Sequence, residues 1–556
     1  MEQPKEEFQI KTLSALEKIF PDKTPKLIEK NGSCLKNSRY NFQVAVNGKA
    51  RKYFCKIKVE GALSDFITIR EVQNVPVHFA FPEYNEDPFV LSKKAGLYPD
   101  LLAPITDAGF PIFVNQWKAF FLTVTPNGDK QLPVGKHKIV IYALDVGDIV
   151  LAKTTYNLEV LDDILPEFPI FNINWLHYDC ISNYYNVPVF SERFNELLDE
   201  YVKNLLTHDI NSLMVPLFTP PLDTTVGKER KTAQLLKVEF VGGRYEFNLE
   251  PLRIFIRRMR ALGVKYFEFS HLFTQWGGTA CPKVIATENG EEKQIFGWDT
   301  PSDSEEYISF LSALLPKIVK ITEEEGIKKD CFWHITDEPS EKAIPLYSKL
   351  KEIVQNLVGD MEIIDALSEY AFYEKKLVTI PVVETTKFKD FQNKCAKFAV
   401  YYCCTIQENL SNRFISLPSL RTRILGLQCY MHNIAGFLHW GYNFWNSANS
   451  RTPINPWLVN DTVGAYPAGD AFVVYPGESG PLDSLRLEIL SDGWQDYRIA
   501  MLAERYTNKA TIQALLEEDG IKDFDIYPHE PKKYIKMREK LLDIIRKNAK
   551  PGTFTS

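Results

Sequence analysis

From residue 170 onward, short apolar segments alternate with longer amphipathic segments, and this order constrains the fold more than any other feature. The expected strands are 170–175, 212–218, 264–269, 331–335, 361–364, 378–383, 398–402 and 434–440. The expected helices are 190–207, 252–262, 304–325, 341–358, 388–394, 418–431 and 484–506. Repeated strand–helix units predict parallel strands covered by helices. About eight such strands favour a (β/α)8 barrel over an open doubly wound sheet, because no glycine-rich dinucleotide or phosphate-binding motif is present.

The first 160 residues follow a different pattern of short alternating segments separated by turns such as Asn47-Gly48. This pattern predicts an antiparallel β-sandwich, with helical periodicity largely confined to the first twenty residues or so. Two prolines and three acidic residues between Leu161 and Pro169 mark the junction. We therefore expect a multidomain protein, with a β-sandwich over 1–160 and a catalytic (β/α)8, TIM-like barrel with C-terminal closing helices over 161–556.

Composition excludes several classes of partner. The 556-residue chain has a formal net charge of −7 and no lysine- or arginine-rich stripe, which argues against nucleic acid and anionic membranes as partners. No apolar run approaches the ~20 residues of a membrane span, and the first residues lack the apolar core of an export signal. Nine cysteines without CxxC spacing suggest a reducing compartment. We expect a cytoplasmic location, although a secreted protein without its signal peptide would look the same; the oligomeric state is not predicted.

Two adjacent carboxylates end one of the expected strands. The segment from Cys331 to Pro339 reads Cys-Phe-Trp-His-Ile-Thr-Asp-Glu-Pro, so Asp337 and Glu338 follow an apolar, aromatic run. Barrel enzymes take their catalytic residues from the carboxyl ends of strands, which makes this pair the candidate catalytic site. The alternative is that the two acids only cap the next helix, where negative charge is favoured.

Aromatic and polar residues gather at the ends of other expected strands. Sugars present apolar C–H faces edged with hydroxyls, and their sites pair aromatic platforms with a few polar groups. The candidate substrate-binding residues are His271, Trp276, Tyr401, Trp440, Tyr442, Asn443 and Trp445. Packing in a large core is an equally good explanation for any single aromatic. No HxxxH, HExxH or Cys/His cluster occurs, so neither a metal nor a cofactor is expected.

The consecutive positions of Asp337 and Glu338 suggest that the two carboxyls have different roles in catalysis. Retaining glycosidases usually need two carboxyls ~5–5.5 Å apart on opposite sides of the anomeric carbon, and neighbouring residues do not easily supply this. In substrate-assisted glycosidases one carboxyl protonates the leaving oxygen, while the other orients the 2-acetamido group of the sugar. The acetamido carbonyl then attacks the anomeric carbon, so no enzyme nucleophile is needed.

Several ordered motifs resemble glycoside hydrolase family 123, the β-N-acetylgalactosaminidases. They are Asp337-Glu338-Pro339, Ser270-His-Leu-Phe with Trp276-Gly, Gly436-Phe-Leu-His-Trp440-Gly-Tyr-Asn-Phe-Trp445, and Tyr475-Pro-Gly with Ser484-Leu-Arg486-Leu-Glu488 and Asp492-Gly-Trp-Gln-Asp496-Tyr497. The resemblance implies that Asp337 orients the acetamido group and that Glu338 is general acid and then general base. It also implies retention of configuration and release of N-acetylgalactosamine from non-reducing β-linked ends of glycans, glycosphingolipids among them.

Two alternatives to this activity remain open at the level of the sequence. The same mechanism could act on another β-linked 2-acetamido sugar such as N-acetylglucosamine, because loops read the orientation of the 4-hydroxyl. The chain could also be a non-catalytic carbohydrate-binding or scaffold protein, in which the acids cap a helix. His439 and Arg486 could be structural in either case.

Overall fold

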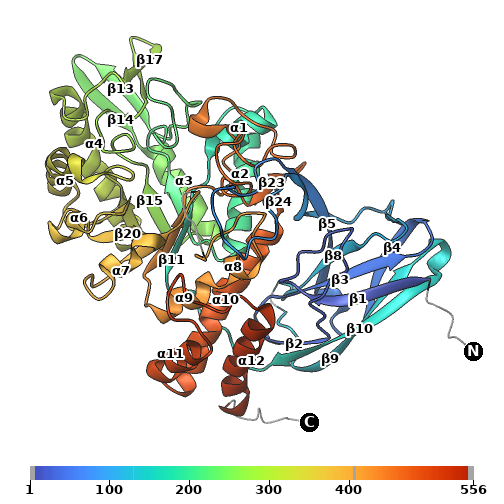
Figure 1. Ribbon diagram of the computed structural model, residues 1–556. Coiled ribbons are helices and arrows are strands. Elements are labelled where there is room, and N and C mark those ends of the chain that lie inside the picture. The colour runs from blue at the N-terminus through green and yellow to red at the C-terminus, as the bar shows by residue number, and fades with distance from the viewer. Residues whose placement is uncertain (1–6, 129, 405–408, 549–556) are drawn as a thin grey trace, which may run out of the picture. The chain divides into compact units, whose positions relative to one another are not determined.

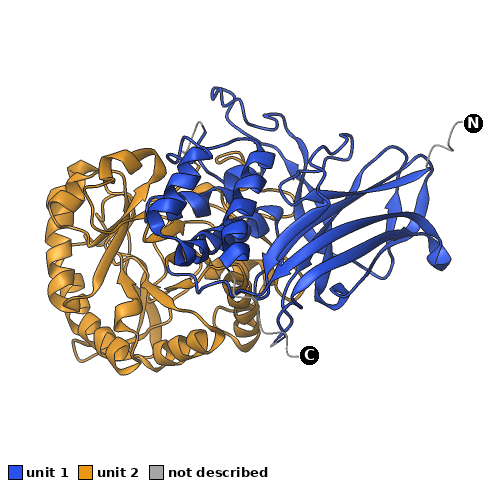
Figure 2. Ribbon diagram, turned by 90° about the horizontal axis from the view of Figure 1, so that it is seen from below, with its two compact units in different colours: residues 1–169, 407–433, 482–556 blue, residues 170–406, 434–481 orange. Residues whose placement is uncertain are grey.

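The computed structural model describes residues 7–128, 130–404 and 409–548 (Figure 1). The chain divides into two compact units (Figure 2). Unit 1 comprises Met1–Pro169, Gln407–Asn433 and Leu482–Ser556, and unit 2 comprises Ile170–Ile406 and Ile434–Pro481. The last helices of the chain therefore group with the N-terminal strands. Within the described ranges, no helix combines the length and apolar character needed to cross a membrane.

Unit 1 contains two five-stranded sheets. The first has the order β1 (Phe8–Ser14), β3 (Tyr40–Gly48), β8 (Lys118–Val124), β5 (Ile67–Val77) and β6 (Gly96–Pro104). The second has the order β2 (Asn31–Leu35), β10 (Val150–Leu161), β9 (Gly135–Leu144), β4 (Lys52–Glu60) and β7 (Phe110–Ile112). The predicted antiparallel sheets are confirmed, except that β2 and β10 pair in parallel. Helical periodicity at the N-terminus was a wrong prediction, because Phe8–Ser14 pairs antiparallel with β3 along its whole length.

The core of the sandwich follows from strand alternation. Phe42, Val44 and Val46 of β3 are fully buried in one apolar cluster with Ile139 and Ile141 of β9. Alternate side chains of a strand share a face, so each sheet contributes every second residue to the space between the sheets.

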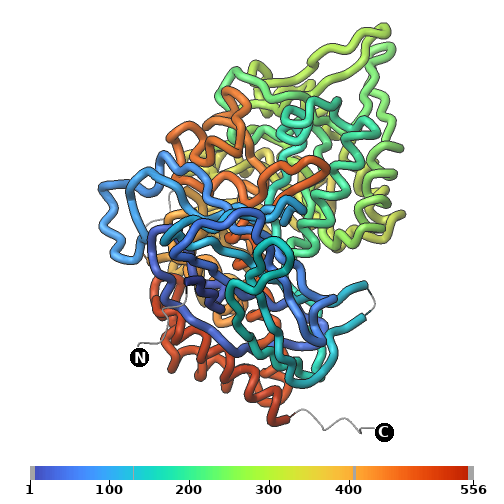
Figure 3. Tube along the Cα trace, turned by 90° about the vertical axis from the view of Figure 1, so that its right-hand side faces the viewer, coloured from blue at the N-terminus to red at the C-terminus, as the bar shows by residue number. Residues whose placement is uncertain are grey.

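Unit 1 also contains the helices α8 (Leu420–Arg423), α9 (Leu425–Met431), α10 (Leu485–Tyr506), α11 (Lys509–Glu518) and α12 (Pro531–Asn548). The pair α8/α9 replaces the single helix expected over 418–431. Gly426 and Gly493 let α9 and α10 approach closely, since a Cβ at Gly426 would lie 1.8 Å from the carbonyl oxygen of Gly493. The α12 helix, red in Figure 3, contacts β2 through the Arg538 guanidinium, which donates to the Ser33 carbonyl at 3.0 Å.

Unit 2 is built around eight parallel strands, as the sequence predicts. Their order is β11 (Phe171–Asn174), β22 (Gly436–His439), β21 (Ala399–Tyr401), β20 (Ile380–Glu384), β19 (Glu362–Leu367), β18 (Cys331–Trp333), β15 (Tyr266–Phe269) and β12 (Ser212–Val215). The Asn211 side chain links the two end strands: its Oδ1 accepts from the Asn172 backbone N–H at 2.9 Å, and its Nδ2 donates to the Ile170 carbonyl at 3.0 Å. The sheet is therefore a nearly closed barrel.

The helical cover of unit 2 differs from a regular (β/α)8 barrel. Its helices are α1 (Tyr178–Tyr185), α2 (Glu192–Thr207), α3 (Glu250–Leu262), α4 (Glu305–Glu324), α5 (Ile344–Val358), α6 (Ala371–Glu374) and α7 (Phe388–Phe391). The helices α6 and α7, which follow β19 and β20, have only four residues each. A four-stranded sheet that the sequence pattern did not reveal has the order β14 (Arg244–Asn248), β13 (Lys237–Val241), β16 (Val284–Glu288) and β17 (Glu291–Phe296). Two short strands, β23 (Val474–Pro476) and β24 (Pro481–Asp483), come later in the chain.

Candidate active site

Asp337 and Glu338 lie in the loop that follows β18, which ends at Trp333, at the carboxyl end of the barrel strands. The Glu338 backbone is left-handed (φ +43°), and its N–H donates to the Ala366 carbonyl at 3.1 Å. The Asp337 carbonyl accepts from the Trp276 N–H at 2.7 Å, and Trp276 is also left-handed (φ +60°). A left-handed backbone is costly for residues other than glycine and concentrates at functional sites. Hydrogen bonds to β19 and to the loop that follows β15 thus fix the loop that carries both carboxyls.

Both carboxyls line a small cavity of about 110 Å³ within unit 2. The lining residues are Trp175, His177, Leu222, Asp223, Gln275, Trp276, Asp337, Glu338, Ala366, Tyr401, Cys403, Cys404, Leu438, Trp440 and Tyr466. Five of these side chains are aromatic rings of tryptophan or tyrosine, and three are carboxylates. Aromatic walls with a few charged groups suit a ligand that has both apolar faces and hydroxyls.

The two carboxyls hold protons more tightly than ordinary acids. Burial and then the charge of Glu338 raise the pKa of Asp337 well above its usual range. The enclosed surroundings raise the pKa of Glu338, although its side chain reaches solvent. The Tyr401 hydroxyl, which donates to Glu338 Oε1 at 2.7 Å, opposes that rise. Because the two groups interact, ionisation of one makes ionisation of the other less favourable, and they titrate as a pair.

The Trp440 ring forms one wall of the cavity and is fixed from two sides. Its indole Nε1–H donates to Asp470 Oδ2 at 3.0 Å, and the ring makes an edge contact with Tyr466 at a centroid distance of 5.5 Å. The Trp440 carbonyl lies 2.8 Å from His177 Nε2. An immobile indole is a good platform for an apolar sugar face, since little conformational freedom is lost on binding.

A buried ion pair orients His177. Arg230 makes a two-pronged contact with Asp179, through Nε–Oδ2 at 2.9 Å and Nη2–Oδ1 at 2.6 Å, and its Nη2 lies 3.0 Å from His177 Nδ1. Burial and the Arg230 charge lower the pKa of His177 to about 3. His177 is therefore neutral, accepts from Arg230 at Nδ1 and donates from Nε2 to Trp440.

Asp223 presents an incompletely bonded carboxylate to the cavity. Its Oδ1 accepts from the Tyr466 hydroxyl at 3.3 Å, whereas its buried Oδ2 has no hydrogen-bond partner among the described residues. Burial raises the pKa of this carboxyl. A buried acceptor without a donor is costly, so Oδ2 is a ready site for a ligand hydroxyl.

Of the predicted site residues, five meet at the cavity: Trp276, Asp337, Glu338, Tyr401 and Trp440. His271 is 1% exposed and outside the cavity lining, with its ring stacked on His334 at a centroid distance of 4.1 Å.

The other three predicted residues follow β22 but point into protein. The Tyr442 hydroxyl donates to Asn204 Oδ1 at 2.7 Å, and the Trp445 ring packs edge-on against Tyr201. Asn443 bonds the backbone of His177 in both directions, accepting at Oδ1 (2.7 Å) and donating from Nδ2 (3.2 Å). All three are buried and do not line the cavity, so their contacts hold the loop that presents Trp440.

The candidate residues chosen from the sequence did not include several that line the cavity, among them Trp175, His177, Asp223, Gln275 and Tyr466. Trp175 and His177 come directly after β11, so their position beyond a strand was a usable signal. Asp223 and Tyr466 lie in long connections outside the regular elements, where periodicity gives no guide to direction.

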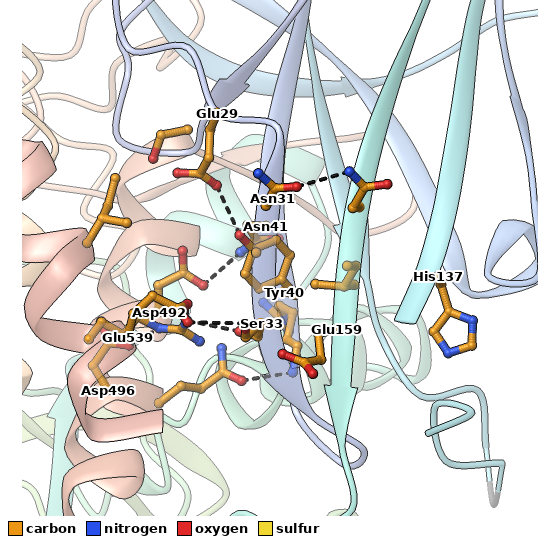
Figure 4. Close-up of a pocket in the computed structure, with 18 of the residues that line it drawn as sticks. Glu29, Asn31, Ser33, Tyr40, Asn41, His137, Glu159, Asp492, Asp496 and Glu539 are labelled. Carbon is orange, nitrogen blue, oxygen red and sulfur yellow. Dashed lines mark hydrogen bonds and ion pairs between the residues drawn. The ribbon is translucent and has the colours of Figure 1, made fainter. Parts of the chain in front are cut away.

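A larger cavity of about 580 Å³ lies within unit 1 (Figure 4). Its polar groups bond mainly to one another: Glu29 accepts from the Tyr40 hydroxyl at 3.0 Å, and Asn41 donates to Asp492 at 3.0 Å. Asp496 is held by Arg423 and Arg538 in the same way. Polar groups that bond to one another in this way are typical of a packed contact between strands and helices. Despite its larger volume, this cavity is therefore a weaker candidate for the active site than the cavity that contains Asp337 and Glu338.

One group of side chains in unit 2 has the composition of a metal site. His271, His334 and Asp365 each place a ligand atom within 4.8 Å of the others. Both ring nitrogens of His334 already contact carboxylates, at 2.8 Å to Glu268 and 3.3 Å to Asp365. A protonated imidazole satisfies this environment, since it supplies two N–H donors and the positive charge that two carboxylates require.

Comparison with known proteins places this geometry in a family. The model of the glycoside hydrolase 123 catalytic domain matches residues 175–503. A solved family 123 glycoside hydrolase from Clostridium perfringens, described in terms of glycolipid glycan hydrolysis, superposes with a TM-score of 0.74 at 14% identity, covering 97% of this chain and 99% of that one. A putative β-galactosidase from Bacteroides fragilis gives a TM-score of only 0.29 at 9% identity, covering 83% of this chain and 58% of that one. No curated protein matches the sequence. The chain belongs to glycoside hydrolase family 123.

Proposed function

We propose that this glycoside hydrolase releases β-linked N-acetylgalactosamine from the non-reducing ends of glycans by substrate-assisted catalysis. One observation carries the proposal: Asp337 and Glu338 are consecutive residues that open into a single aromatic-walled cavity. Adjacent carboxyls on one loop suit a mechanism in which the substrate supplies its own nucleophile.

In the first step, Glu338 protonates the glycosidic oxygen while the acetamido carbonyl oxygen bonds to the anomeric carbon. The bond from that carbon to the leaving oxygen breaks, and an oxazolinium ion forms. Asp337 accepts the hydrogen bond of the acetamido N–H and stabilises the positive charge. In the second step, Glu338 removes a proton from water, which attacks the anomeric carbon from the side that the aglycone left. The acetamido group is restored and the configuration is retained.

The electrostatics of the site support this assignment. The mechanism needs the pair to hold one proton, and the raised pKa values of both carboxyls favour that state. In the free protein Tyr401 favours the ionised form of Glu338. A bound sugar that covers Glu338 would favour its neutral form, while an acetamido N–H would favour ionised Asp337. Substrate binding thus moves the proton to the residue that must donate it.

The remaining cavity residues fit the recognition of one sugar ring. Trp440 offers a platform for the apolar face, and Asp223 Oδ2 offers an acceptor for a hydroxyl. The small volume suits a terminal sugar, which supports exo action. The structural neighbour from Clostridium perfringens, whose description concerns glycolipid glycans, makes glycolipids a reasonable natural substrate class.

Two other functions remain candidates. The same pair would act on another β-linked 2-acetamido sugar such as N-acetylglucosamine, and the aromatic cavity would also serve a protein that binds glycans without cleaving them. The deciding experiment is nitrophenol release from 4-nitrophenyl β-N-acetylgalactosaminide, the gluco isomer and the 2-hydroxy galacto analogue, with wild type and Glu338→Gln. Glu539→Gln is a matched control, because Glu539 is a partly buried carboxylate of unit 1 with a raised pKa.

The outcomes separate the candidates. Turnover confined to the galacto acetamide, lost in Glu338→Gln and kept in Glu539→Gln, is the expected result. Faster turnover of the gluco isomer would assign the other sugar. Equal turnover of the 2-hydroxy analogue would refute acetamido participation, and ligand binding without turnover of any substrate would indicate a binding protein. The cytoplasmic location stays a prediction.

A further inference from the structure

His334 lies three positions before Asp337 and is fully buried between two carboxylates. Its Nε2 is 2.8 Å from Glu268 Oε2, and its Nδ1 is 3.3 Å from Asp365 Oδ1. Burial alone would lower the pKa of His334, but the hydrogen bonds and charges of Asp365 and Glu268 raise it to about 9. Both nitrogens therefore carry protons, and His334 is an imidazolium ion at neutral pH.

The contacts of this imidazolium join three neighbouring strands. Glu268 belongs to β15, His334 follows β18, and Asp365 belongs to β19, which are consecutive in the barrel. β18 is short and ends at Trp333, and beyond it, within the described residues, only the His334 and Ile335 carbonyls continue the pairing, accepting from the Leu272 and Phe273 N–H groups at 3.2 and 3.1 Å. The two side-chain contacts bind the end of β18 to its neighbours at the point where regular pairing stops.

Asp365 in turn binds the backbone of the loop that carries Asp337 and Glu338. Its carboxylate accepts from the Ile335 N–H at 3.1 Å and the Thr336 N–H at 3.4 Å, and from the Tyr347 hydroxyl. These two N–H groups immediately precede Asp337. A carboxylate that is itself held by an imidazolium and a hydroxyl cannot rotate without breaking several charge-assisted bonds, which makes it a rigid anchor.

The charge of His334 also acts on Asp337. It opposes the effects of burial and of Glu338, Asp365 and Asp223, all of which raise the pKa of Asp337. Glu268 is not among the charges that act most strongly on Asp337. Another titratable neighbour is His271, whose stacked ring is neutral because burial and the His334 charge lower its pKa well below the usual value.

We infer that His334 is a positioning residue for the proposed reaction: clamped as a cation between Glu268 and Asp365, it fixes the loop that carries Asp337 and Glu338 and keeps Asp337 available as an ionised acceptor. The inference rests on the proposed function. His334 does not line the cavity, so its action is through Asp365 and through its charge rather than by contact with substrate.

The test compares three variants with wild type on 4-nitrophenyl β-N-acetylgalactosaminide over a range of pH. His334→Gln removes the cation and keeps a polar side chain. Tyr347→Phe removes only the hydroxyl that donates to Asp365. Tyr430→Phe is the matched control, since its buried hydroxyl also donates to a carboxylate, Glu504 Oε2 at 2.8 Å, but in unit 1. Circular dichroism and melting temperatures report whether each variant folds.

We expect His334→Gln to lower kcat by roughly 10- to 100-fold with little change in KM, because a misplaced catalytic group costs turnover more than binding. The acid limb of its kcat/KM profile should move up by roughly one pH unit, since a nearby cation favours the ionised acid. Tyr347→Phe should lower kcat about fivefold, the loss expected for one hydrogen bond. Tyr430→Phe should match wild type. A His334→Gln enzyme with wild-type kcat and an unmoved acid limb would overturn the inference.

A second measurement does not depend on activity or on the folding of His334→Gln. In wild-type protein labelled with ¹⁵N-histidine, one ring should remain doubly protonated at about pH 8, where an ordinary histidine is neutral. The absence of such a ring, or a stoichiometric metal ion in the purified protein, would overturn the imidazolium assignment. Failure of wild type to cleave any 2-acetamido glycoside would instead refute the proposed function and leave this measurement to decide the state of His334.

Discussion

Removing the Tyr401 hydroxyl should move the alkaline limb of the activity profile. In the structure this hydroxyl donates to Glu338 Oε1 at 2.7 Å and stabilises the ionised carboxylate. A hydrogen bond to a charged group contributes about 1.5–3 kcal/mol, and 1.36 kcal/mol corresponds to about one pKa unit. Because the Glu338 side chain reaches solvent, water takes over part of the lost interaction, and the lower end of that range applies. We therefore expect Tyr401→Phe to raise the pKa of Glu338 by about one unit.

The sign follows from the role of Glu338 as general acid. Activity requires its proton, so kcat/KM falls as pH rises through its pKa, and a higher pKa extends activity to higher pH. The assay is the pH dependence of kcat/KM on 4-nitrophenyl β-N-acetylgalactosaminide for wild type, Tyr401→Phe and Tyr402→Phe. Tyr402 is the matched control, because its buried ring packs against Phe437 and His439 and does not line the cavity. An alkaline limb that stays in place, or moves to lower pH, in Tyr401→Phe would refute this account of Glu338.

Three further changes test other parts of the site. Asp337→Asn should lower kcat on the acetamido substrate by roughly 100-fold or more, because a neutral amide cannot stabilise the oxazolinium charge. Steady-state kinetics measure this fall in kcat. Unchanged turnover would contradict the role of Asp337 in orienting the acetamido group. Asp223→Asn should lower kcat/KM about tenfold, since a charged acceptor for a hydroxyl is lost, and an unchanged value would show that Asp223 Oδ2 meets no substrate group. Asn443→Ala should reduce the free energy of unfolding of unit 2 by about 2–4 kcal/mol, because it breaks two buried hydrogen bonds to His177. Denaturant unfolding followed by fluorescence measures this change. Unchanged stability would show that other contacts hold the loop.

The sequence predicted the parts of the fold that depend on local periodicity. All eight barrel strands and the long helices were evident, because short apolar runs indicate buried strands and apolar residues at helical spacing indicate helices with one buried face. The four-stranded sheet formed by β13, β14, β16 and β17 was missed, although Gly242-Gly243 and Asn289-Gly290 are turn signals between its strand pairs. The parallel pairing of β2 with β10 was also invisible, because strand alternation is the same in both orientations.

The sequence located residues of the candidate site only where a chemically suitable side chain comes soon after a predicted strand. Asp337 and Glu338 lie in the first residues after a strand, where barrel enzymes carry their catalytic groups, so their position could be predicted. Beyond β22 the chain leaves regular structure, and the sequence could not show that Trp440 faces the cavity whereas Tyr442 and Trp445 face protein. Asp223 and Tyr466 meet through long connections, and such contacts depend on tertiary folding rather than on spacing along the chain.

The central claim is that the substrate's own acetamido oxygen attacks the anomeric carbon. The most direct test compares kcat/KM for 4-nitrophenyl β-N-acetylgalactosaminide with that for its N-trifluoroacetyl analogue, which has nearly the same shape but a much weaker carbonyl nucleophile. The account predicts a fall of roughly 100-fold or more for the fluorinated substrate. Equal rates for the two substrates would contradict it and would require a nucleophile from the protein.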